Sequence, residues 1–103
     1  MALLPFRTKA TAQSEGPDLS AVLAGTSIEV MPRTAEKVED FRAILPNGTR
    51  VYIAHIDGTP IDDMVATAKR ISGEGFDVMP HFPARIIKDE ATLADWIARY
   101  QGE

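Results

Sequence analysis

"RVYIAHI", residues 50–56, is followed directly by "DGTPIDDMVATAKRISGEG", residues 57–75, and these two stretches decide the fold. The first is a nearly continuous run of β-branched and aromatic residues, typical of a strand buried on both faces. The second predicts a helix with Thr59 as N-cap and Pro60 at the first helical position. Its core-facing positions recur with helical spacing: Ile61, Met64, Val65 and Ala68. Residues 50–75 therefore predict one strand–helix unit.

The same order recurs on both sides of this unit. "TSIEVMP", residues 26–32, predicts a strand, and "TAEKVEDFRAIL", residues 34–45, predicts a helix capped by Thr34. "FDVMPHFPAR", residues 76–85, predicts a third strand, and "KDEATLADWIARY", residues 88–100, predicts the helix after it. Such alternation is typical of parallel strands joined by right-handed crossovers. We therefore expect an α/β fold of three successive βα units, a partial (β/α)8 TIM barrel.

The domain organisation follows from this count of units. We expect residues 1–17 to be a flexible N-terminal leader and residues 18–103 to hold the first three βα units of an incomplete barrel domain. A three-stranded parallel sheet has two unpaired edges and an uncovered face. We therefore expect a fragment of a longer polypeptide, or a partner chain over the sheet, which leaves a homo-oligomer open.

The composition is that of a globular protein and excludes several classes of function. The chain is 45% hydrophobic and 25% charged, with a net charge of −4. It has no cysteine, which excludes disulfides, thiolate zinc sites and cysteine nucleophiles. Its charges are interspersed and no apolar run reaches the length of a membrane span, so we expect neither a nucleic-acid nor a membrane partner. These features favour a cytoplasmic protein.

One polar residue lies in each expected strand region: Glu29, His55 and His81. The two intervals are equal and about the length of one βα unit, and the carboxyl ends of parallel strands are where such folds bind ligands. We therefore expect the carboxylate and the two imidazoles to line one rim, with Pro80 and Pro83 ending the strand ladder beside His81. Taken singly, each residue also fits a structural role. The three would suit zinc or iron, but no local HxH or HxxxH spacing supports a metal site.

Three stretches together resemble the methylenetetrahydrofolate reductase family, in a divergent bacterial branch: "SIEVMPRT", "RVYIAHIDGTP" and "GFDVMPHFPAR". The resemblance runs from about Thr26 to the C-terminus. The family's first strand ends in E-F-F-P-P, where this chain has Glu29-Val30-Met31-Pro32. Its third strand ends in P-H-L-T, matched by Pro80-His81-Phe82-Pro83. The match is looser after the second strand, where Ala54-His55-Ile56 replaces Thr-Tyr-Gly.

The resemblance implies a flavin enzyme with FAD at the mouth of a (β/α)8 barrel. Such enzymes pass a hydride from NAD(P)H through the flavin to 5,10-methylenetetrahydrofolate, giving 5-methyltetrahydrofolate for methionine synthesis. By resemblance, Glu29 is the general acid that protonates a folate nitrogen, and His81 and His55 contact the cofactor. The family's later flavin- and folate-binding residues have no counterpart here, so we expect the isolated chain to be inactive. The alternative is a non-catalytic α/β binding or interaction module derived from such a barrel.

Overall fold

The computed structural model describes residues 18–102. Three parallel strands form one sheet in the order β1-β2-β3, with β1 at Ile28–Val30, β2 at Arg50–Ile53 and β3 at Asp77–Pro80. The helical elements are α2 at Leu19–Leu23, α3 at Pro32–Ala35, the 3-10 turn η2 at Phe41–Ala43, α4 at Ile61–Gly73 and α5 at Glu90–Gly102. The α/β class and the parallel strands are confirmed. The predicted leader, residues 1–17, lies outside the described residues.

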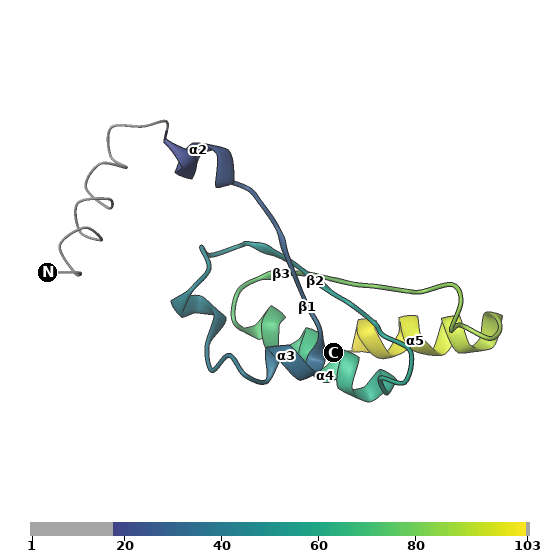
Figure 1. The fold of residues 1–103 in the computed structure, drawn as a ribbon. Coiled ribbons are helices and arrows are strands. Elements are labelled where there is room, and N and C mark those ends of the chain that lie inside the picture. The colour runs from purple at the N-terminus through teal and green to yellow at the C-terminus, as the bar shows by residue number, and fades with distance from the viewer. Residues whose placement is uncertain (1–17, 103) are drawn as a thin grey trace, which may run out of the picture.

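The core lies between one face of the sheet and the helices that follow β1 and β2, as Figure 1 shows. Val51 and Ile53 of β2 are fully buried, and Met64 and Ile71 of α4 are fully buried against them. Burying side chains of this size contributes roughly 1.5–3 kcal/mol each. The spacing of Met64, Val65 and Ala68 predicted this stripe, and all three are buried.

The other face of the sheet is open. The register aligns Glu29 with Tyr52 and Tyr52 with Met79, so these three side chains share the face opposite α4. Met79 is 44% exposed, and the Glu29 side chain is 58% exposed. Parallel strands are usually covered on both faces, so this open face is unusual for the fold class.

The helix predicted over residues 34–45 is wrong. The structure has the four-residue helix α3, which begins before Thr34 with its cap at Met31 and ends at Ala35, and then the separate turn η2. Arg70 of α4 holds the chain after α3 in a non-helical course, because its guanidinium donates hydrogen bonds to the carbonyls of Ala35, Val38 and Glu39. The Ala35 carbonyl also accepts from the Val38 N–H at 3.1 Å, a turn-type bond three residues along the chain.

One smaller expectation also needs correction: helix α4 begins one residue later than predicted, with Pro60 at the N-cap instead of Thr59. Strand β3 ends at Pro80, as expected, and the His81 N–H donates one further hydrogen bond to the Ile53 carbonyl at 2.9 Å. Successive residues point their N–H groups to opposite sides of a strand, so the donor that Pro80 lacks would face away from β2.

Candidate functional site

The register of the sheet decides which of the three predicted site residues can meet. Glu29 aligns with Tyr52, and Tyr52 in turn aligns with Met79. His55 lies three residues beyond Tyr52 and therefore has the opposite parity. His81 lies two residues beyond Met79 and keeps the same parity. Equal spacing in the sequence thus does not give equal positions in the sheet.

Glu29 and His81 meet on the open face. The Nε2 atom of His81 lies 3.5 Å from Oε1 of Glu29, although the two residues come from the outer strands β1 and β3. Tyr52 of the central strand lies beside them, with its ring centroid 6.0 Å from that of His81. Both side chains of the pair stay accessible, at 58% for Glu29 and 41% for His81. The structure therefore brings together a carboxylate, an imidazole and an aromatic ring on one accessible surface.

His55 lies apart from this pair. It is only 7% exposed, and its ring packs against Trp96 of α5 with centroids 4.9 Å apart. Its Nε2 lies 3.0 Å from the Thr59 carbonyl, which can only accept, so Nε2 is the donor. The Nδ1 atom is buried without a hydrogen-bond partner. His55 is therefore a buried residue that holds the β2–α4 loop in place. It lies on the side of the sheet away from Glu29.

A hollow of about 460 Å³ adjoins the Glu29–His81 pair. Its lining is rich in rings and proline: Tyr52, Met79, Pro80, His81, Phe82 and Pro83. Flat aromatic groups favour such surroundings because they stack on aromatic side chains and on proline. The lining therefore offers aromatic and proline surface of the kind on which a flat heteroaromatic ring stacks.

Tyr100 of α5 stands behind the hollow and supports Phe82. The two rings meet edge to face with centroids 5.5 Å apart. Burial raises the pKa of Tyr100 to about 12, and its hydroxyl is buried without a partner. A phenol in that state neither accepts nor releases a proton near neutral pH. Tyr100 therefore positions the lining and takes no part in proton transfer.

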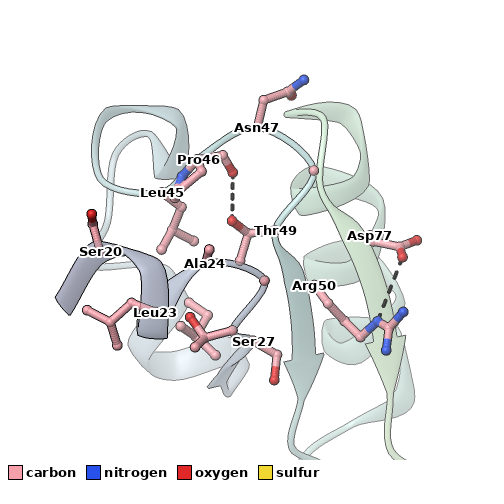
Figure 2. Close-up of a pocket in the computed structure, with 14 residues that line it drawn as sticks. Ser20, Leu23, Ala24, Ser27, Leu45, Pro46, Asn47, Thr49, Arg50 and Asp77 are labelled. Atoms are coloured by element: carbon pink, nitrogen blue, oxygen red, sulfur yellow. Dashed lines mark hydrogen bonds and ion pairs between the residues drawn. The ribbon is translucent and has the colours of Figure 1, made fainter. Parts of the chain in front are cut away.

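A larger hollow, about 720 Å³, lies at the opposite end of the strands, between α2 and residues 45–49. Figure 2 shows Leu23 and Leu45 at its walls, and Figure 1 shows α2 standing off from the sheet. Three of its polar side chains already have partners: the Thr49 hydroxyl donates to the main-chain carbonyl of Pro46 at 2.7 Å, and Nε of Arg50 lies 3.8 Å from Oδ2 of Asp77. This hollow offers no converging acid, base or nucleophile among the described residues, so the Glu29–His81 surface is the stronger candidate site.

Tyr52 and Met79 were not among the predicted site residues, because the signal was the polarity of Glu29 and the two histidines. Alternation along a strand places Met79 on the same face as His81, and the register places Tyr52 beside Met79. The alignment of Tyr52 with the other two strands, which the sequence does not state, was the missing information.

No protein-family model matches the chain. Within residues 18–102, no group of three or more histidine and acidic side chains is arranged to hold a metal ion. In the same part of the chain, none of the helices combines the length and apolar character needed to cross a bilayer.

Proposed function

We propose that this chain supplies the acid and part of the flavin surface of a reductase resembling methylenetetrahydrofolate reductase, acting in the cytoplasm. The observation that carries the proposal is the 3.5 Å approach of Glu29 to His81 beside a ring-lined hollow. These are the two residues that match the family's first- and third-strand motifs. A partial (β/α)8 barrel, with further units or another chain covering the open face, is the architecture that this function requires.

The lining of the hollow fits the ring system of FAD. Tyr52, His81 and Phe82 supply aromatic surface, and His81 supplies a ring nitrogen that can hydrogen-bond to a heteroatom. Bound FAD would carry a hydride from NAD(P)H to 5,10-methylenetetrahydrofolate. A hollow of about 460 Å³ holds one ring and not a whole dinucleotide. The remaining cofactor contacts are therefore expected from protein outside the three units described here.

Glu29 is the proposed proton donor. In the proposed step its carboxyl oxygen gives a proton to a nitrogen of the folate's five-membered ring as the carbon–nitrogen bond of that ring breaks. The proton then replaces the lost bond on nitrogen, and Glu29 is left as a carboxylate. An acid that keeps its proton at neutral pH must be shielded from water. Glu29 is 58% exposed, so the role requires bound ligand or further protein over the open face.

His81 and His55 take different roles in this proposal. His81 lines the hollow and is the proposed cofactor contact. His55 was also expected to touch the cofactor, but its ring packs on Trp96 and its Nε2 binds the Thr59 carbonyl. We therefore assign His55 a positioning role for the β2–α4 loop.

The two half-reactions of the assembled reductase test the acid role. Glu29→Gln should lower the rate of folate reduction at least about a hundredfold, the usual contribution of a general acid. Reduction of FAD by NAD(P)H should stay nearly unchanged, because that step needs no proton from Glu29. Glu36→Gln is the matched control, since Glu36 is an exposed acid beside α3, on the helix-covered side. Equal loss in both half-reactions would contradict the proposal.

A second candidate function is a non-catalytic interaction module that works through its sheet. The open face of a parallel sheet favours it, because such a face is normally covered. The colour of the assembled protein, purified with the further units or the chain that covers the open face, separates the two functions. An assembly that retains FAD absorbs near the flavin's visible bands, whereas one that acts only through protein contacts stays colourless.

A further inference from the structure

The two histidines differ in their access to protons. His55 is buried, and its Nε2 donates to the Thr59 carbonyl, so its proton has a fixed place. The side chain of His81 is 41% exposed, and its Nε2 lies 3.5 Å from Oε1 of Glu29. This separation is somewhat longer than a normal hydrogen bond, as is common for catalytic pairs before a ligand binds. His81 can therefore exchange protons with water and lies next to the proposed acid.

Among the described residues that share the open face, His81 is the one suited to give Glu29 a proton near neutral pH. By alternation along the strands, Arg50, Tyr52 and Asp77 lie on this face as well. Arg50 and Asp77 lie toward the other end of the strands, where they approach each other to 3.8 Å. Guanidinium groups and phenols keep their protons near neutral pH, and a carboxylate beside an arginine has none to give. An imidazole gains and loses its proton in that range.

We propose that His81 passes its proton to Glu29 when a ligand or further protein covers the open face, a step that rests on the proposed acid role of Glu29. In water a carboxylate and an imidazolium are both well solvated. Covering the face removes that water and disfavours both charges, so a neutral acid beside a neutral imidazole becomes the more stable state. The N–H bond at Nε2 of His81 breaks as an O–H bond forms at Oε1 of Glu29. When the face opens again, the neutral imidazole takes a proton from water or buffer.

This transfer explains how an exposed carboxylate becomes an acid. The Glu29 side chain is 58% exposed, and a carboxyl group in water is ordinarily ionised at neutral pH. A ligand that covers the face would trap the ionised form unless a proton donor is covered with it. His81 lies close enough to be that donor, and the binding of the ligand itself then prepares the acid for each turnover.

The pH dependence of folate reduction tests the transfer in the assembled reductase at saturating FAD. In His81→Gln, Glu29 must take its proton directly from the solvent. The variant should therefore be slower than the wild type by less than about tenfold near pH 5, but by about a hundredfold near pH 7.5. Reduction of FAD by NAD(P)H, measured in the same samples, should change little at either pH. His55→Gln alters the buried histidine and should change the rate by the same factor at both pH values.

A second variant supplies the missing donor from solution. His81→Gly leaves room for free imidazole, which should raise its rate of folate reduction near pH 7.5 at least about tenfold. Pyrazole has the same shape but does not carry a proton near neutral pH, so it should have no effect. A His81→Gln deficit of equal size at both pH values overturns the transfer, and so does imidazole acting no better than pyrazole. A wild type that reduces FAD but not folate would instead overturn the acid role of Glu29 itself, and the transfer with it.

Discussion

Glu29 and His81 approach to 3.5 Å across a strand that separates them, since β2 lies between β1 and β3. Their side chains must therefore reach toward each other over the face that carries Tyr52. An aromatic ligand resting on Tyr52 would lie directly against both groups. This geometry joins the proposed acid and the proposed cofactor contact into one unit, although a whole strand–helix unit separates them along the chain.

The first prediction concerns flavin binding by this unit. His81→Ala should weaken FAD binding roughly five- to tenfold, the loss expected for one aromatic contact and its hydrogen bond. Quenching of flavin fluorescence on titration with protein measures the affinity. His55→Phe is the matched control, because it keeps a ring against Trp96 on the other side of the sheet. Equal weakening by both variants would contradict the assignment of the ring to the open face.

The second prediction concerns the core beneath the sheet. Met64 is fully buried, so Met64→Ala should lower the free energy of unfolding by about 3 kcal/mol through lost burial and the cavity left behind. Urea denaturation followed by circular dichroism measures the change. Met79→Ala removes the same side chain from the open face, where 44% is exposed, and should cost under about 1 kcal/mol. Similar costs for the two variants would mean that Met79 is covered in solution.

The third prediction concerns the arginine that binds the chain after α3. Arg70→Met should lower the free energy of unfolding by about 2 kcal/mol or more, because the carbonyls of Ala35 and Glu39 lose their hydrogen bonds from the guanidinium. Arg70→Lys should restore only part of the loss, since an ammonium lacks the guanidinium's planar fork. Denaturation midpoints measure all three proteins. Arg42→Met is the control: its only described partner is Asp40 on the surface, so its midpoint should barely move.

The sequence predicted much of the fold because its signals are local. The apolar stripe of residues 61–68 and the β-branched run of residues 50–53 each form the expected element. The helix over residues 34–45 was wrong, and the turn that replaces it is held by Arg70, which belongs to the next strand–helix unit along the chain. A periodic pattern cannot reveal a side chain of another unit that binds the main-chain carbonyls of the segment.

Part of the site was also predicted, because its signals too are local. Glu29 and His81 were found because each is a polar residue in an apolar strand region, and they meet. His55 shows the same local signal but lies on the other face, because the register pairs Glu29 with Tyr52 and not with His55. Parity within a strand can be read from sequence, whereas the register between parallel strands is set by the loops and helices that join them.

The last prediction concerns Tyr100, whose hydroxyl is buried without a partner and whose pKa is raised to about 12 from an ordinary value of 10.0. The folded state holds the phenol proton more tightly than the unfolded state does. The free energy of unfolding is therefore unaffected by this group below pH 10 and falls as the pH rises toward 12. Tyr100→Phe should therefore unfold less readily than the wild type in that alkaline range. At pH 7 it should be equally stable or up to about 1 kcal/mol more stable, since the unpaired hydroxyl is gone. Urea midpoints between pH 7 and 12 measure this, with Tyr52→Phe as control. If the urea midpoint of Tyr100→Phe falls with rising pH as much as that of the wild type, the Tyr100 hydroxyl reaches water in solution.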